Sequence, residues 1–339
     1  MARTVGILGA SGFAGGELLR LVAGHPDLEL AWAAGETAAG KPVAALHPGL
    51  SAVVGDLRFT TYDPAAADGL DLVFLALPHG ASAPLMADLR KRAGVVVDLA
   101  ADFRLQDAAL YPTWYGEEHP APELLPEFAY GLPELFRDDL RGASAVAAAG
   151  CYVTAAALAL APLVRTGLVE PSGIVVDAAS GVSGAGRKVA ETTAFTTVDE
   201  DLRAYGLLDH RHTPEIEQAT GAQVLFTPHL APVNRGILAT CYARPTDATS
   251  TAEVLDALRT AYAGERFVVV GEDPPSTKAT LGSNCAHLTA RADDRTGWVV
   301  SLCALDNLVK GASGQAVQCA NLALGLDESA GLPLAGLVP

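Results

Sequence analysis

The chain has 339 residues, 50% of them hydrophobic, and a formal net charge of −16. That length exceeds what one compact core usually holds, so we expect two domains. The acidic balance argues against a nucleic-acid partner, because phosphate backbones bind basic surfaces.

The five cysteines include no C-x-x-C pair, and their number is odd. This usage favours a reducing cytoplasm over a disulfide scaffold, and it also argues against a zinc site. The first residues, MARTVGILGASG, lack the long apolar region and cleavage site of a secretory signal. We therefore expect a cytoplasmic protein with no structural metal.

Apolar runs alternate with helical segments in the first half of the chain. TVGILGASGFAGGELLRLVAGHP predicts a strand, a glycine turn and a helix. LELAWAAG, DLVFLALP, GVVVDLA and SAVAAA predict further strands, with a helix near 83–92. Continuous apolar strands between helices are typical of a parallel sheet covered on both faces. The expectation is a Rossmann-type, α/β nucleotide domain over residues 1–150.

The first glycine turn has the spacing G-x-x-G-x-x-G, from Gly9 to Gly15. Glycines at a strand–helix turn let backbone amides approach a pyrophosphate at the positive end of the helix. The strand–turn–helix context favours dinucleotide binding over a plain tight turn. After the second strand, Glu36 would suit the ribose diol of NAD, whereas Thr37 and Lys41 would suit the phosphate of NADP. For each of the three residues, a place in a solvated loop without a binding role is an equally good interpretation.

Residues 142–164 carry no charge, and Cys151 lies among them. The stretch is long enough for a membrane span, but alanine dominates it, Gly150 interrupts it and Pro162 lies near its end. A strand, a glycine turn and a helix over 153–164 explain it better. Cys151 then falls at a helix N-terminus, which lowers the pKa of a thiol. A small core residue is the competing interpretation.

The second half of the chain follows a different pattern. GIVVDAAS, GILATCYARP and FVVVG predict strands, and HLTARADDRTGWVVSLCAL predicts an antiparallel hairpin turning at DDRTG. We expect an α+β catalytic and oligomerisation domain with a mixed sheet over residues 151–310. A last helix, 311–326, is expected to pack back onto the first domain.

Three polar segments could carry chemistry. In HRHTPEIEQ, Thr213 is the expected helix cap, so His210, Arg211 and His212 would lie in the loop before it, suited to proton transfer and anion binding. SGVSGAGRK, residues 180–188, is a donor-rich loop. Arg104 follows the carboxyl end of a sheet strand, where ligands of such sheets bind. Each segment could also be a plain surface loop.

Ten segments resemble, in order from residue 9 to 318, the N-acetyl-γ-glutamyl-phosphate reductases, relatives of aspartate-semialdehyde dehydrogenase. They are GASGFAGGELLRL, FLALPHG, DLAADFRL, YGLPEL, GCYVTAAALAL, SGVSGAGR, HRHTPEIEQ, FTPHLAPVNRGI, GSN and DNLVKGASGQAVQ. The resemblance implies NADPH-dependent reduction of a small acyl phosphate through a cysteine thioester, in arginine biosynthesis. It also implies a dimer or tetramer.

The resemblance implies a role for each matching residue. Cys151 would be the nucleophile, and His212, with His210 as the alternative, the acid and base. Arg104, Arg211 and Ser183 would bind substrate. The implied cofactor residues are Gly9, Ser11, Gly12, Phe13, Ala14, Gly15, Thr37, Gly184 and Asn307, the last facing the nicotinamide amide.

The chain departs from the family pattern at two places. Val153 stands where the family has proline, and Ala148-Ala149-Gly150 replaces an Asn-Pro-Gly lead-in, which would loosen the turn below the cysteine. Glu36 stands where many relatives have a basic or small polar residue, so NAD is not excluded. Three other functions stay open: reduction of a carrier-bound aminoadipyl phosphate, reduction of aspartyl phosphate, and nucleotide sensing without catalysis.

Overall fold

The computed structural model describes residues 2–188 and 190–337. The chain divides into two compact units. Unit 1 comprises Met1–Tyr111, Glu117–Ala149 and Ala312–Leu332. Unit 2 comprises Pro112–Gly116, Gly150–Gly311 and Pro333–Pro339. The longest segment of unit 2, Gly150–Gly311, therefore begins immediately before Cys151.

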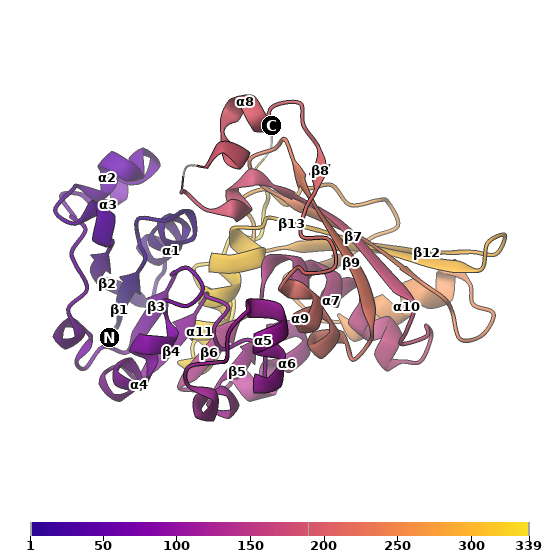
Figure 1. Ribbon diagram of the computed structural model, residues 1–339, viewed down its shortest axis with the longest axis horizontal. Helices are drawn as coiled ribbons and strands as arrows, with labels where there is room; N and C mark the ends of the chain where they lie inside the picture. Colours follow the sequence, from indigo (N-terminus) through magenta and orange to yellow (C-terminus); the bar gives the residue numbers. More distant parts are fainter. Residues whose placement is uncertain (1, 189, 338–339) are drawn as a thin grey trace. The chain divides into compact units, whose positions relative to one another are not determined.

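Unit 1 is built on a six-stranded sheet in the order β2-β1-β3-β4-β6-β5 (Figure 1). Its strands are β1 (Arg3–Leu8), β2 (Leu28–Ala34), β3 (Leu72–Leu75), β4 (Val95–Asp98), β5 (Ala129–Gly131) and β6 (Ala145–Ala148). All neighbouring pairs are parallel, which confirms the Rossmann-type class. The sequence did not predict β5, since three residues carry too little pattern.

The helices of unit 1 are α1 (Phe13–Ala23), α2 (Val43–Leu46), α3 (Ser51–Val54), α4 (Ala83–Arg92), α6 (Pro133–Leu140) and α11 (Gly314–Ala323). Of these, α1, α4, α6 and α11 pack against strands of the sheet and bury apolar residues there. Every residue of α11 is buried, and α11 packs against α1, α6, β4 and β6. The Ser313 hydroxyl, just before α11, donates to the carbonyl of Ala14 at 2.9 Å. This bond joins the last helix to the first.

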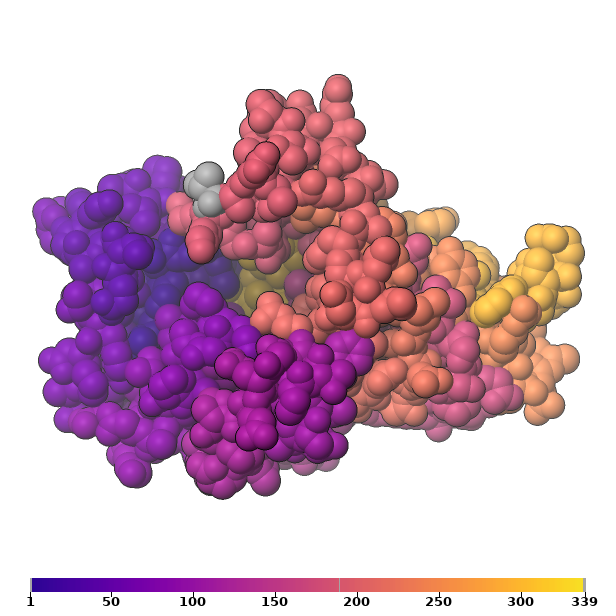
Figure 2. Space-filling model, in the orientation of Figure 1, coloured from indigo at the N-terminus to yellow at the C-terminus, as the bar shows by residue number. Residues whose placement is uncertain are grey.

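Unit 2 holds a seven-stranded mixed sheet in the order β11-β12-β13-β10-β7-β9-β8. Its strands are β7 (Ile174–Gly181), β8 (Arg203–Ala204), β9 (Val224–Ala231), β10 (Ile237–Ala243), β11 (Val268–Val270), β12 (Ala286–Asp293) and β13 (Trp298–Leu305). The mixed sheet confirms the α+β class expected for the second half. The β12–β13 hairpin turns at residues 294–297, and its tip projects from the surface of unit 2 (Figure 2).

The helices that pack on the unit 2 sheet gather on one of its faces (Figure 1). The helices in this part of the chain are α5 (Tyr111–Tyr115), α7 (Cys151–Arg165), α8 (Phe195–Val198), α9 (His212–Thr220) and α10 (Thr251–Ala261). The central helix, α7, is buried from Tyr152 to Leu163 and packs against β10, β13, α9 and α10. The uncharged stretch is therefore a strand, a turn and a core helix, and the described residues contain no helix that is long and apolar enough to span a membrane.

Pro162 lies inside α7 without ending it. A proline has no N–H, so the carbonyl of Leu158, four residues earlier, loses its helical donor. The hydroxyl of Tyr262, which directly follows α10, donates to that carbonyl at 2.7 Å. A side chain thus satisfies the acceptor that the proline leaves, and the helix continues to Arg165.

Candidate active site

The glycine turn of unit 1 has the close backbone contacts that a dinucleotide site requires. Gly9 has φ +78°, and a Cβ there would lie 2.2 Å from the carbonyl oxygen of Ala76. A Cβ on Gly15 would lie 2.2 Å from the carbonyl oxygen of Gly9. Gly12 precedes α1, whose first turn contains no acidic residue. These residues fit a pyrophosphate held by the amides at the start of α1.

The end of β2 lies beside this turn. A Cβ on Gly35 would lie 2.9 Å from the Cβ of Ser11, so the two loops touch. Glu36 and Thr37 follow in an exposed single turn. The Glu36 carboxylate accepts the backbone N–H of Tyr62 at 2.7 Å. Glu36 therefore has a structural partner within the chain itself.

The carboxyl ends of β3 and β4 carry a buried polar network that the sequence did not predict. Asp102 accepts hydrogen bonds from the backbone N–H groups of Gly80 at 2.7 Å and Ala83 at 2.9 Å, and it pairs with His79 at 2.6 Å. Burial alone would raise the pKa of Asp102, but the hydrogen bonds from His79 and the backbone outweigh it and lower the pKa. An ionised Asp102 thus stabilises the start of α4.

Ser82 connects Asp102 to a second carboxyl group. The Ser82 hydroxyl oxygen lies 2.8 Å from Asp102 and 2.7 Å from Asp98. One hydroxyl has a single proton, so it cannot donate to both carboxylates. Burial raises the pKa of Asp98 to about 7. A protonated Asp98 that donates to Ser82, which in turn donates to Asp102, satisfies all three groups.

Arg104, a predicted substrate residue, lies in the same region of unit 1. Its side chain is 9% exposed, and its Nη2 donates to the carbonyl of Leu99 at 2.6 Å. The arginine is therefore held in a fixed place near the end of β4 instead of projecting into solvent as a surface charge.

Cys151, the predicted nucleophile, is the first residue of α7, which begins two residues earlier than expected. The Gly150 N–H donates to the Oε1 atom of Glu215 at 2.9 Å, and Glu215 is fully buried. On another side, a Cβ on Gly311 would lie 2.8 Å from the Cβ of Cys151. Two segments remote in sequence therefore hold the backbone at the cysteine, which itself stays partly exposed.

The histidine segment lies against the same end of α7. Thr213 is not the cap: α9 begins at His212, and the Nδ1 atom of His210 accepts the His212 N–H at 3.1 Å. The prediction of the cap was wrong because the helix begins two residues earlier: Arg211 is the N-cap residue and makes no side-chain cap bond, while the His210 ring accepts the first helical N–H. The rings of His210 and His212 are 4.8 Å apart, and the Tyr152 ring is 5.8 and 5.9 Å from them.

His210 is a poor proton acceptor at neutral pH. Burial, assisted by the cation of Arg211, lowers the pKa of His210 to about 4. At neutral pH His210 is then uncharged, and because Nδ1 accepts the His212 N–H, its proton lies on Nε2. His210 is suited to hydrogen-bond donation, which favours His212 as the base.

Two phenols adjoin the histidines. The Tyr205 hydroxyl donates to the Tyr152 hydroxyl at 3.2 Å, which donates to the carbonyl of His229 at 3.0 Å. Burial raises the pKa of both phenols, that of Tyr205 to about 12. Both therefore remain protonated donors at neutral pH, and neither was predicted from the sequence as a site residue.

Ser183 and Asn307 come together, although 124 residues separate them. The Asn307 side-chain amide donates to the Ser183 hydroxyl at 3.0 Å and accepts the Gly236 N–H at 2.8 Å. Gly184 adjoins the same amide, since a Cβ there would lie 3.8 Å from its nitrogen. Asn307, which is 2% exposed, thus fixes the loop that carries Ser183 and Gly184.

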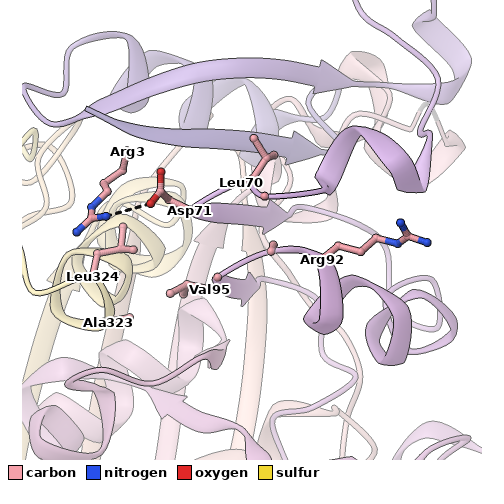
Figure 3. Close-up of a pocket in the computed structure, with 10 residues that line it drawn as sticks. Arg3, Leu70, Asp71, Arg92, Val95, Ala323 and Leu324 are labelled. Atoms are coloured by element: carbon pink, nitrogen blue, oxygen red, sulfur yellow. Dashed lines mark hydrogen bonds and ion pairs between the residues drawn. The ribbon is translucent and has the colours of Figure 1, made fainter. Parts of the chain in front are cut away.

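Arg211 stands between the two histidines in sequence, and unit 1 has a pocket of its own. Arg211 is exposed, with its guanidinium over the Tyr115 ring at 5.6 Å. A shallow pocket at the amino ends of β1, β3 and β4 contains the Arg3–Asp71 ion pair (Figure 3). Ligands of parallel sheets bind at the carboxyl ends, so this pocket is not the active-site candidate. Among the described residues, no three His, Cys, Asp or Glu side chains gather as metal ligands.

Two family models match the chain. One, described as the NAD binding domain of semialdehyde dehydrogenase, matches residues 4–143. The other, described as the semialdehyde dehydrogenase dimerisation domain, matches residues 151–307. The second match begins at Cys151, close to the point where the chain passes from unit 1 into unit 2.

Curated relatives match over the whole length. A protein of Acidothermus cellulolyticus is 48% identical, and one of Magnetococcus marinus is 46% identical, each over 100% of both chains. Both are named N-acetyl-gamma-glutamyl-phosphate reductase. Among solved structures, aspartate semialdehyde dehydrogenase II of Vibrio cholerae superposes with a TM-score of 0.72 at 16% identity, covering 96% of this chain and 99% of that one. At this low identity, the likeness shows that the two chains share a fold.

Proposed function

The chain belongs to the N-acetyl-γ-glutamyl-phosphate reductases, within the semialdehyde dehydrogenases, and from this we propose that it reduces N-acetyl-γ-glutamyl phosphate to N-acetylglutamate 5-semialdehyde and phosphate. The observation that carries the proposal is a partly exposed Cys151 at the first position of α7, where the ring of the following residue, Tyr152, contacts the rings of His210 and His212. The reaction would be a step of arginine biosynthesis.

In the proposed first step, the Cys151 sulfur attacks the acyl carbon as a thiolate. A C–S bond forms, the C–O bond to phosphate breaks, and phosphate leaves with the bonding electrons. The position at the start of α7 favours the thiolate, because the helix N-terminus carries partial positive charge. Arg104, Arg211 and Ser183 are the proposed ligands of the substrate's phosphate and carboxylate.

A bound nicotinamide cofactor would supply the hydride that reduces the thioester. His212 donates a proton to the oxygen of the reduced acyl carbon and recovers it as the C–S bond breaks and the aldehyde leaves. The cysteine returns as thiolate, so the enzyme ends the cycle as it began. Asn307 is proposed to face the cofactor's amide while it holds Ser183 and Gly184 in place.

The glycine turn is the proposed cofactor site, and NADPH is the proposed reductant. The hydrogen bond from the Tyr62 N–H gives Glu36 a role that does not need a ribose diol, and exposed Thr37 and Lys41 are available to a 2′-phosphate. We expect a kcat/KM for NADPH that exceeds that for NADH. A preference for NADH that Glu36→Ala abolishes would assign Glu36 to the ribose and contradict this choice.

The two units take different tasks in this proposal. Residues 1–150, with the last helix, bind the cofactor, and residues 151–310 carry the thiol and the histidines. Half-exposed apolar residues on the face of the unit 2 sheet opposite α7, α9 and α10, such as Leu225, Tyr242 and Val269, support a homo-oligomer built across that face. Five free cysteines support a reducing cytoplasm as its compartment.

The direct test is reduction of the acetylated acyl phosphate by purified protein, followed by loss of reduced-nicotinamide absorbance, with aspartyl phosphate as the competitor. We expect Cys151→Ser to lower kcat by roughly three orders of magnitude or more. Cys241→Ala is the matched control, because burial raises the pKa of that thiol to about 12 and keeps it inert. Full activity in Cys151→Ser, or turnover of aspartyl phosphate alone, would overturn the proposal.

A further inference from the structure

The carboxyl group of Glu215 bonds to the backbone directly before the nucleophile. It lies on the first turn of α9, is 0% exposed, and accepts the Gly150 N–H at 2.9 Å. A hydrogen bond between a carboxylate and a backbone N–H is charge-assisted and roughly twice as strong as a neutral one. The bond ends on the residue directly before Cys151, so it restricts the peptide from which the sulfur projects.

This restraint matters because the local sequence supplies little stiffness of its own. The lead-in is Ala148-Ala149-Gly150, and Tyr152 and Val153 follow the cysteine, so no proline fixes φ on either side. The Gly150 N–H is buried and would be costly to leave without an acceptor. The structure supplies the missing stiffness from a helix that is 65 residues away in sequence.

The same helix carries the proposed base. His212 and Glu215 are three residues apart on α9, a spacing that places side chains on neighbouring positions of one helix face. A carboxylate that ties α9 to Gly150 therefore also sets the position of His212 relative to Cys151. Errors of about 1 Å in such geometry can cost roughly 100-fold in rate.

We propose that Glu215 is a positioning residue that acts through Cys151. Its carboxylate fixes the Gly150–Cys151 peptide and so holds the thiol at the correct distance and orientation relative to His212. As a kinetic claim it rests on the proposed function. It assigns no contact between Glu215 and substrate, so the effect belongs to kcat and not to KM.

The chain offers a matched control on the same helix. The Oε1 atom of Glu217 accepts the Val224 N–H at 3.1 Å, a bond of the same kind that ties α9 to the start of β9 instead of to Gly150. Loss of the Glu217 bond also frees α9 from a neighbouring backbone segment, but it leaves the bond to Gly150 in place. Only loss of the Glu215 bond displaces the cysteine.

The test compares Glu215→Ala, Glu215→Gln and Glu217→Ala, each checked for folding by its melting temperature. We expect Glu215→Ala to lower kcat about 100-fold with KM within about twofold. Glutamine keeps the oxygen acceptor, so Glu215→Gln should stay within about fivefold of the parent. Glu217→Ala should keep the parent kcat. Equal loss of kcat in Glu215→Ala and Glu217→Ala, or no rescue by glutamine, would refute the positioning role.

A second readout needs no substrate and separates this inference from the proposed function. The rate of Cys151 alkylation by iodoacetamide is measured against pH in the two Glu215 variants, which both lack the charge. We expect a higher pH midpoint in Glu215→Ala, because only glutamine retains the bond that keeps the sulfur at the helix N-terminus. Equal pH midpoints of alkylation in Glu215→Ala and Glu215→Gln would refute the positioning role even if the parent protein is an active reductase. A parent protein that does not reduce the acyl phosphate would refute the proposed function and leave the alkylation result unaffected.

Discussion

At the scale of single residues, the candidate site combines groups suited to react with a carboxyl group that holds the backbone beside them. Cys151, His210, His212 and Ser183 were predicted because their residue types match a chemistry and their neighbours match a turn or helix start. Glu215 was not predicted, because an isolated glutamate on a helix looks like a solvated residue until the fold buries it. Its role depends on a partner that is distant in sequence.

The histidine pair gives the first prediction at this scale. We expect His212→Asn to lower kcat by about 100-fold or more, as loss of general acid–base catalysis does. His210→Asn should cost less than about tenfold, because asparagine can accept the His212 N–H in place of the ring nitrogen. Steady-state kinetics across pH 5–9 decide this, and the reverse order of the two losses would assign the base to His210.

Asp98 gives a pH prediction. Its pKa is about 7 in the folded protein and near the ordinary value of 3.8 in the unfolded chain. Between these values the folded state retains a proton that the unfolded state has lost, so this group makes the free energy of unfolding fall as pH rises from about 4 to 7. Asparagine mimics the protonated form and does not titrate.

The measurement is chemical denaturation of the parent and Asp98→Asn at several pH values. We expect the variant to gain stability relative to the parent as pH rises from about 4 to 7, by an amount on the order of a few kcal/mol. Asp88→Asn is the exposed control and should not reproduce that trend. A parent-minus-variant difference that stays constant over this range would show that Asp98 is ionised throughout.

At the scale of elements, long patterned segments were predicted better than short or proline-containing ones. The helix at Ala83–Arg92 and the β12–β13 hairpin match their predictions closely. The sequence did not indicate β9 as a strand, because Pro228 interrupts it. The Pro228 carbonyl accepts the Tyr205 N–H, so its missing N–H faces the short β8 side and leaves the pairing with β7 intact.

The proline in α7 gives the element-scale prediction. We expect Tyr262→Phe to lower the free energy of unfolding by about 1–3 kcal/mol, because the Leu158 carbonyl then has no donor. Adding Pro162→Ala supplies a backbone N–H, so the double variant should recover part of that loss. Denaturation of the four proteins gives the coupling energy. If Pro162→Ala has the same effect with either residue at 262, the hydroxyl does not replace the missing donor.

At the scale of the whole molecule, the prediction concerns assembly. One face of the unit 2 sheet is covered by helices, whereas the other exposes Leu225 by 49%, Tyr242 by 37% and Val269 by 47%. We expect Tyr242→Glu to shift the protein to a smaller species in sedimentation or light scattering, because a charge would be buried in the proposed interface. Val53→Glu, at an exposed apolar residue of unit 1, is the control. An unchanged mass for Tyr242→Glu would exclude this face.

The sequence by itself determined the parallel and mixed sheet classes, the glycine turn and the position of Cys151 at a helix start. Each of these follows from the types and spacing of residues that are neighbours in the chain. Only the tertiary structure decided the partners: Glu215 on Gly150, Tyr262 on Leu158, Asn307 on Ser183. Such contacts join residues far apart in the chain. No local pattern specifies them, since the hydrogen bonds become necessary only when folding removes water from both groups.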